Sequence, residues 1–205
     1  MKSKKLLLFA VAFAVITLPV AAQNQPWGLP WGTYAFTGDD GCLGSSAFDA
    51  TTLTATVPTS ISSFSSSGTF TFNASWWKTV TGSGIANFTN VGYSTNPDGS
   101  GNGFSQTVTL PFTYTVGKDG ALTVVPGTLS AIYLTGPNPG YTFTKAASQR
   151  AGTVGMASFT GQIALNGSIV LTSSTTAVET VLNSSGGVID QEICHRTRIL
   201  VPVLP

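Results

Sequence analysis

Alternation of apolar and polar side chains with a period of two is the feature that most constrains the fold. It is clearest from Phe104 to Val116, where every second residue from Phe104 is apolar except Gln106, and Ser, Thr or Pro111 stands between. Successive side chains of a β-strand point to opposite faces, so this segment predicts a strand with one buried and one wet face. Pro111 has no N–H for a ladder, which predicts an edge, a bend or a bulge there.

Shorter segments repeat the pattern at 33–37, 52–57, 69–77, 141–144 and 169–182. Between them lie groups of Gly, Pro, Asn, Asp and Ser at 96–99, 118–120, 136–140, 166–167 and 184–187, which are typical of turns. The turn Lys118-Asp119-Gly120 predicts a hairpin. We therefore expect roughly eight to ten strands and no internal helix.

Evenly spaced short strands predict an all-β fold, either an antiparallel up-and-down β-barrel or a β-sandwich. Only 8% of residues are charged, but aromatic residues make up 10%, which argues against a disordered chain. The Ser-rich stretch Ser60 to Gly68 is expected to be a flexible loop. The Gly-rich stretch Gly82 to Gly103 is expected to hold weak or bulged strands.

The N-terminal segment has the pattern of a signal peptide. Lys2, Lys4 and Lys5 precede an apolar run from Leu6 to Val20, which is shorter than the roughly 17–25 residues of a membrane-spanning helix. Small residues at Val20-Ala21-Ala22 predict cleavage before Gln23. We thus expect a signal peptide at 1–22, a loose arm at 23–30 and one domain at 31–205. The protein should be secreted or periplasmic and meet a membrane only through the signal peptide.

The charge balance excludes one class of partner. Nine Lys and Arg stand against eight Asp and Glu in the whole chain, and three of the nine lie in the signal peptide. The six that remain leave the mature chain with a net charge of −2. Nucleic-acid binding would need a basic surface for the phosphates, so no nucleic acid is expected as a partner.

The two cysteines, Cys42 and Cys194, predict a disulfide if the chain is exported; the alternative is a pair of buried free thiols. A bridge over about 150 residues would contribute at most about 5 kcal/mol by the chain-entropy model. It would also bring the first and last strands together. An up-and-down barrel pairs those strands, so the cysteines favour a barrel, although a sandwich can also join its ends.

Three segments resemble exported bacterial proteins with calycin-like (lipocalin-like) β-barrels. They are Gly32-Thr33-Tyr34-Ala35-Phe36, the turn from Tyr114 to Gly120, and the last strand from Ile193 to Val201. The family's first strand often carries Gly-x-Trp, where this chain has Gly32-Thr33-Tyr34, and its last strand carries an Arg, which Arg196 or Arg198 would match. The resemblance implies a calycin-like barrel and no particular activity.

The densest polar cluster is Asp190, Glu192, His195, Arg196 and Arg198. Residues 192 and 195 would point to opposite faces of a regular strand, which argues against an acid–histidine pair for proton transfer. Cys194, Arg196 and Arg198 would share a face. We expect the two arginines to face solvent and His195 to point inward, either as a core histidine or as a polar anchor in a ligand cavity.

No catalytic motif and no set of metal ligands is present, so we expect a protein that is not an enzyme and needs no cofactor. The favoured function is binding of a small apolar or amphipathic ligand in a barrel; the alternative is a structural or adhesive surface protein. Trp76-Trp77 would place one Trp outward, where it could stack on a surface glycan. The other candidate ligand-binding residues are Phe70, Phe104, Phe112 and Tyr114, beside His195.

Overall fold

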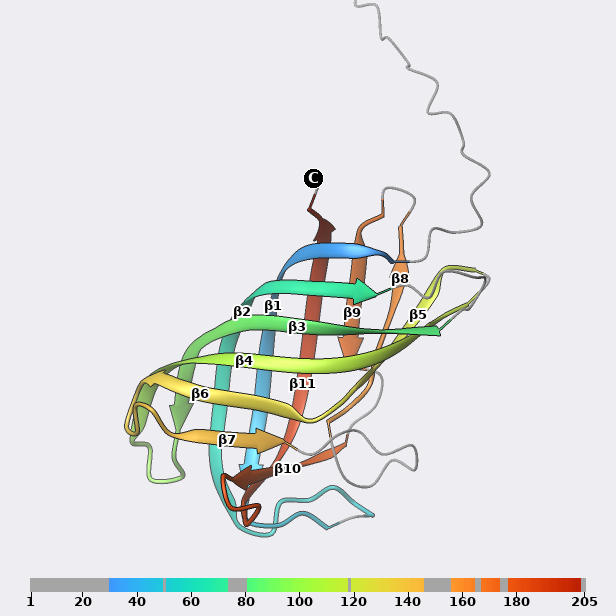
Figure 1. The fold of residues 1–205 in the computed structure, drawn as a ribbon. Coiled ribbons are helices and arrows are strands. Elements are labelled where there is room, and N and C mark those ends of the chain that lie inside the picture. Colours follow the sequence, from blue (N-terminus) through green and yellow to red (C-terminus); the bar gives the residue numbers. More distant parts are fainter. Residues whose placement is uncertain are drawn as a thin grey trace, which may run out of the picture.

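The computed structural model describes residues 30–49, 51–73, 81–117, 119–145, 156–164, 167–173 and 177–203. These ranges contain eleven β-strands and no helix (Figure 1). The strands are β1 (Gly32–Ser45), β2 (Pro58–Asn73), β3 (Thr81–Thr95), β4 (Gly101–Val116), β5 (Ala121–Pro126), β6 (Leu129–Thr135), β7 (Thr142–Lys145), β8 (Phe159–Ile163), β9 (Ile169–Ser173), β10 (Val178–Asn183) and β11 (Val188–Pro202). The prediction of an all-β chain is confirmed.

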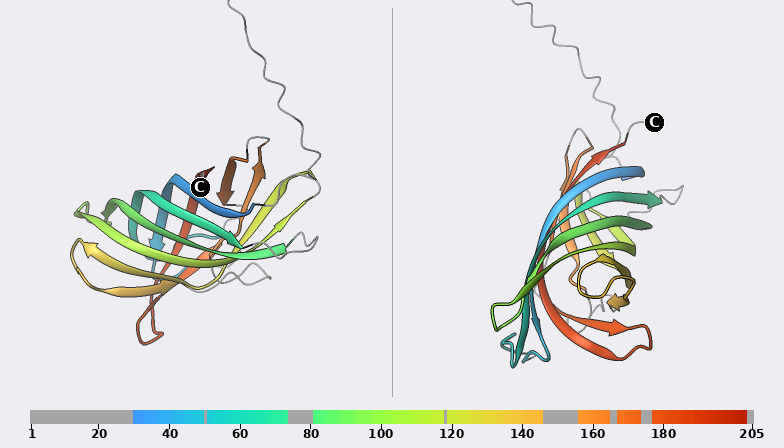
Figure 2. Two further views of the ribbon diagram at one scale, coloured as in Figure 1. Left: turned by 45° about the horizontal axis from the view of Figure 1, so that its top comes forward. Right: turned by 90° about the vertical axis from the view of Figure 1, so that its left-hand side faces the viewer.

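The strands form one antiparallel sheet whose pairings close on themselves. Eight strands follow one another in the order β1-β2-β3-β4-β5-β8-β9-β11, and β11 pairs back with β1. Figure 2 shows how the sheet curves, so that its first and last strands lie side by side. Because each of these strands has a neighbour on both sides, the ring has no free edge among the described residues.

Between the long strands β4 and β11, two rows of short strands lie one beyond the other: β5-β8-β9 and β6-β7-β10. Residues 112–116 of β4 pair with β5, and residues 105–109 pair with β6. On β11, residues 197–200 pair with β9, and residues 188–193 pair with β10. Pro111 lies where β4 changes partners, and its carbonyl accepts a hydrogen bond from the N–H of Gly127 at 2.8 Å. The expected irregularity at Pro111 is therefore a break between two ladders.

The seam between β1 and β11 is fixed covalently. The two strands pair from Tyr34↔Pro202 to Ser45↔Gln191, and Cys42 lies opposite Cys194 in this register. The two cysteines form a disulfide whose Cα atoms are 4.1 Å apart. The predicted bridge is confirmed, and it is typical of a protein that folds in an oxidising extracellular or periplasmic compartment.

The interior of the ring has two different halves. At one end the inward side chains are apolar, and the rings of Phe70, Phe72, Phe112 and Tyr114 pack with centroids 5.2–6.4 Å apart. Toward the other end the inward positions of β1, β7, β10 and β11 carry charged residues instead, which are Asp40, Lys145, Glu179, Arg196 and Arg198. The apolar half supplies the hydrophobic core, and the charged half forms the floor of the site described below.

Three predictions about single segments are wrong. The Gly-rich stretch Gly82 to Gly103 holds most of β3 and the start of β4, which pair with each other without a register shift. The Ser-rich stretch Ser60 to Gly68 is the middle of β2, because its side chains alternate between the interior and solvent like those of its neighbours. The expected strand at 52–57 is a loop with only an isolated bridge, Phe48↔Ala55.

Several predicted features lie outside the described residues, namely the signal peptide at 1–22, all but the last residue of the arm at 23–30, and Trp76 and Trp77. Within the described ranges, no helix has the length and apolar character needed to cross a membrane.

Candidate functional site: a cavity at one end of the ring

One end of the ring contains a cavity of about 300 Å³. Its walls come from the first residues of β2, β4 and β11, from the last residues of β3 and β6, and from Phe143 and Lys145 of β7 and Val181 of β10. Sites for small molecules commonly measure about 300–1,000 Å³. The cavity therefore has room for a ligand at the small end of that range.

One wall of the cavity is a continuous series of aromatic rings. The centroids of Phe64 and Phe104 are 5.8 Å apart, those of Phe104 and Tyr133 are 5.9 Å apart, and those of Tyr133 and Phe143 are 5.4 Å apart. The four residues come from four strands, each at an inward-facing position. Burial raises the pKa of the Tyr133 hydroxyl, and the nearby Glu192 raises it further, so the phenol stays protonated at neutral pH.

The floor of the cavity is charged. The ammonium of Lys145 contacts the carboxylate of Glu192, a residue that lines the cavity. The same ammonium lies 3.3 Å from Oε2 of the fully buried Glu179. Arg196 holds Glu179 from the other side with two hydrogen bonds, one of them 2.6 Å from Nη2 to Oε2. A buried charge needs a partner of this kind, because desolvation otherwise opposes its ionised form.

The same network continues toward β1. Nη2 of Arg198 donates to both oxygens of Asp40 at 2.8 Å, and Nε of Arg196 lies 3.4 Å from Oδ1 of Asp40. The hydroxyl of Ser66 donates to Asp40 at 2.6 Å. Gly38 faces Arg198 across the seam, and a Cβ at Gly38 would come within 2.8 Å of the arginine side chain and 2.0 Å of the carbonyl oxygen of Thr197. Glycine is thus the residue that leaves space for this arginine.

These contacts set the protonation of the network. Burial alone would raise the pKa of Glu179, but Arg196 and Lys145 outweigh it, so this pKa lies below its usual range. Burial alone would lower the pKa of Lys145, but Glu192 and Glu179 outweigh it, so this pKa lies above its usual range. Both groups are therefore charged at neutral pH.

Asp190 is the carboxylate of the cavity whose negative charge has no salt-bridge partner among the described residues. Its two oxygens accept from the hydroxyl of Thr59 at 3.1 Å. Burial raises its pKa; hydrogen bonds from Gln191 and Thr59 and the charge of Lys145 lower it, and Glu192 raises it further. Over the described residues, the interior holds four carboxylates and three cations, which leaves one excess negative charge.

Gln106 contributes an unsatisfied acceptor. It points inward from β4, lines the cavity and is only 7% exposed. Its Oε1 has no hydrogen-bond partner among the described residues. Leaving a buried acceptor unpaired costs about 1–3 kcal/mol, so such a group calls for an explanation.

No protein-family model, curated protein or solved structure matches this chain. An aromatic wall over a polar floor with spare acceptors can bind a small amphipathic molecule that donates hydrogen bonds.

The predicted orientation of the last strand is wrong. Arg196 and Arg198 are buried, with 4% and 3% exposure, and His195 is exposed on the outer face. The prediction that Cys194, Arg196 and Arg198 share a face is confirmed; only the assignment of that face to solvent fails. The reason is that Asp40 and Glu179 stand opposite the arginines inside the ring.

The predicted aromatic residues separate into two groups. Phe104 lines the cavity. Phe70, Phe112 and Tyr114 belong to the packed apolar half, where Tyr114 also donates to the carbonyls of Pro30 and Asn73 at 3.4 and 3.3 Å. His195 lies on the opposite side of the sheet from the cavity.

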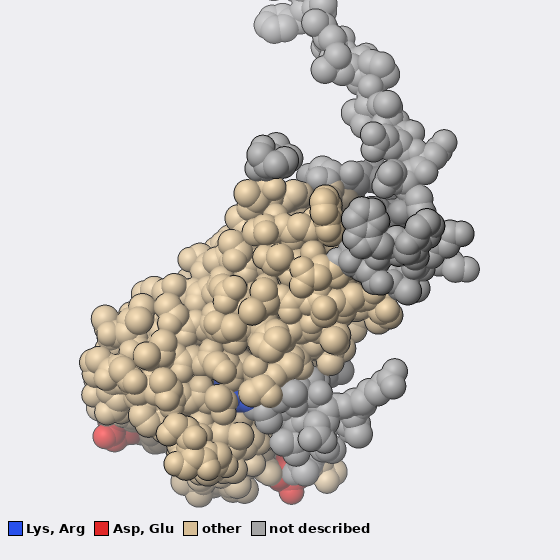
Figure 3. Space-filling view, viewed as in Figure 1, with Lys and Arg blue, Asp and Glu red and all other residues tan. Residues whose placement is uncertain are grey.

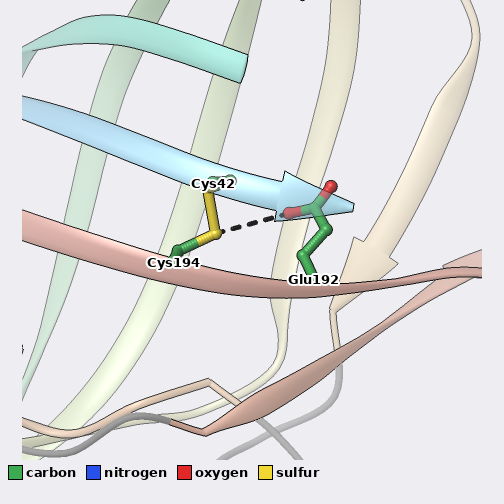
Figure 4. A group of neighbouring side chains, drawn as sticks. All are labelled: Cys42, Glu192 and Cys194. Carbon is green, nitrogen blue, oxygen red and sulfur yellow. Dashed lines mark hydrogen bonds between the residues drawn. A yellow bond between two sulfur atoms is a disulfide. The ribbon is translucent and has the colours of Figure 1, made fainter. Parts of the chain in front are cut away.

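The carboxylate of Glu192 also lies beside the disulfide, as Figure 4 shows. Its Oε2 is 3.5 Å from Sγ of Cys194, and the ligand atoms of Cys42, Cys194 and Glu192 lie close enough together to surround a metal ion. However, the two sulfurs are bonded to each other, so neither is a thiolate, which is the form that binds metals.

Three members of the floor were not predicted from the sequence: Asp40, Lys145 and Glu179. A signal for two of them is visible in hindsight. Asp40 is four residues after Phe36 and Lys145 is two residues after Phe143, so each points to the same, inward face of its strand. The alternation therefore places a charged residue where an apolar one is expected. Charges at inward positions on separate strands are what an interior ion network requires, although the sequence does not say which strands meet.

Proposed function

We propose that this chain is an exported, non-catalytic binding protein whose ring of strands is a calycin-like up-and-down β-barrel. It holds a small amphipathic ligand in the cavity at one end. The observation that carries this proposal is the cavity itself, in which Phe64, Phe104, Tyr133 and Phe143 form an apolar wall above the charged floor.

The pairing order supports a barrel rather than a sandwich. β1 to β4 follow one another by simple antiparallel neighbours, and β11 returns to β1, as in a barrel closed by its first and last strands. Arg198 on the last strand lies over the ring of Phe36 on the first, 5.6 Å from guanidinium carbon to centroid, so the last-strand arginine meets the first strand two residues after Tyr34, the residue that takes the place of the family's Trp. The buried disulfide supports export.

A pair of neighbouring substitutions tests the proposal. Ser62 on β2 points into the cavity, whereas Ser63 points to solvent. Ser62→Phe should fill the cavity, and Ser63→Phe should leave it open. In an NMR titration with phenethyl alcohol, a neutral amphipathic probe, the wild type and Ser63→Phe should show saturable shifts at cavity residues, and Ser62→Phe should show none. Equal binding by both variants would contradict the proposal.

A structural or adhesive role is the second candidate, and one observation favours it. Ile199, Val201 and Val170 are each about half exposed on the outer face and lie on the paired strands β11 and β9. Exposed apolar side chains that adjoin one another can mediate association. Analytical ultracentrifugation should then show self-association that Ile199→Asn abolishes; a monomer at all concentrations would count against this role.

A further inference from the structure

Beside the Ser, Asn and Tyr groups of the cavity, which can donate or accept, three groups offer oxygens that only accept. Asp190 and Glu192 offer carboxylate oxygens, and Gln106 offers its unpaired Oε1. Both contacts of Glu192 use Oε2, and Oε1 has no partner among the described residues. The strongest donor, Lys145, is already held by Glu179 and Glu192. A ligand that satisfies these groups has to donate hydrogen bonds.

The charge of the site points in the same direction. The four interior carboxylates exceed the three interior cations by one, and Asp190 has no cation bound to it among the described residues. A bound ligand with one positive charge would make the interior neutral. The aromatic wall adds to this preference, because the face of an aromatic ring attracts a cation within about 6 Å of its centroid.

Resting on the proposed function, we infer that the ligand of this cavity is a small aromatic ammonium compound. Its ring lies along the wall formed by Phe64, Phe104, Tyr133 and Phe143. Its ammonium group donates to Asp190 and Glu192. Gln106 is the observation independent of the acidic groups: it lines the cavity, and its Oε1, which is closed to solvent and has no partner among the described residues, gains one when a ligand donor draws the amide toward the cavity.

Three probes of similar size separate this inference from the proposed function. They are phenethylamine, which is cationic at neutral pH, phenethyl alcohol, which is neutral, and phenylacetate, which is anionic. Isothermal titration at pH 7 should give the tightest binding for phenethylamine, by about tenfold over the alcohol, which corresponds to one strong cation–π contact and a charge-assisted hydrogen bond. Phenylacetate should bind most weakly, because its carboxylate meets Asp190 and Glu192.

A matched pair of variants locates the effect. Asp190→Asn keeps an oxygen for Thr59 but removes the charge, so it should reduce the affinity for phenethylamine about tenfold and that for phenethyl alcohol by a clearly smaller factor, because a neutral hydroxyl gains less from a carboxylate than an ammonium does. Asp119→Asn, in the turn at the opposite end of the sheet, should change neither.

The outcomes are distinct. If the alcohol binds as tightly as the amine, or phenylacetate binds best, the inference is overturned while the cavity remains a binding site. If no probe binds to the wild type, the proposed function fails as well. If Asp190→Asn weakens the amine and the alcohol equally, Asp190 shapes the cavity and does not recognise charge, which also overturns the inference.

Discussion

At the scale of single residues, the buried amide of Gln106 opposes stability. Its Oε1 is buried without a partner among the described residues. Gln106→Leu removes this acceptor and keeps a side chain of similar volume, so the free energy of unfolding measured with urea should rise by about 1 kcal/mol. Gln162→Leu is the control, because the Nε2 of Gln162 donates to the carbonyl of Asp119 at 2.7 Å and its loss should bring no gain. A loss of stability in Gln106→Leu would mean that the amide has a structural partner.

Glu179 is the residue on which the ion network depends. It is bound by Arg196 and Lys145 together, so Glu179→Gln leaves two buried cations without their shared carboxylate. Breaking a buried ion pair in this way costs about 3–5 kcal/mol. Chemical denaturation should show a loss of that size, whereas the exposed Asp119→Asn should change stability by about 0.5 kcal/mol or less. A small effect of Glu179→Gln would show that water reaches the network.

At the scale of strands, the alternation predicted far more than the residue types did. The prediction that Cys194, Arg196 and Arg198 share one face of the last strand was correct, but the face assigned to solvent is the inner one. Apolar residues such as Ile199 lie outside, and arginines lie inside. The usual rule failed because opposite charges on β1 and β10 compensate the arginines, and contacts between distant strands cannot be obtained from one segment.

The Ser-rich part of β2 was missed for a related reason. Ser is a weak strand former in isolation, and Ser60 to Gly68 has no apolar alternation beyond Ile61 and Phe64. Inside the ring the small side chains are useful, since Ser66 donates a hydrogen bond to Asp40 or to Asn90, each at 2.6 Å, and Ser62 leaves space for the cavity. The cavity itself could not be predicted, because it depends on how seven strands come together at one end of the ring.

The disulfide belongs to the seam between β1 and β11. It joins residues 152 positions apart, and the chain-entropy model assigns about 5 kcal/mol to a loop of that length. The double variant Cys42→Ala with Cys194→Ala should lose up to that amount in urea denaturation. Amide exchange should still show protection along β1, because the backbone pairing from Tyr34 to Ser45 remains. Loss of protection in β1 alone would show that the disulfide holds the seam closed.

At the scale of the whole molecule, three of the nine Lys and Arg of the chain (Lys145, Arg196 and Arg198) are buried inside the ring. On the face in Figure 3, few charged atoms reach the surface of the described residues. Ser and Thr on the outward positions of β2 and β4 supply the polarity instead. Charged side chains usually lie on the surface of a protein, but these three cations lie in the floor of the cavity.

The interior network predicts how stability depends on pH. The pKa of Glu179 is lower in the folded protein than its usual 4.5, so its contribution to stability is present above that value and is lost as the pH falls through the folded pKa. The pKa of Asp190 is raised, which has the opposite sign and offsets part of the loss. Urea denaturation should therefore show a decrease below pH 4.5 that is smaller in Glu179→Gln. An identical acid dependence in both proteins would exclude Glu179 as its source.

The most direct test of the account is the position of the ligand inside the ring. In a complex with phenethylamine, NMR should show nuclear Overhauser effects between the ring protons of the ligand and those of Phe104, Tyr133 and Phe143. Ser62→Phe should abolish these signals. Contacts only with outer-face residues such as Ile199 and Val201, or no contacts with the protein at all, would contradict the claim that this cavity is a binding site.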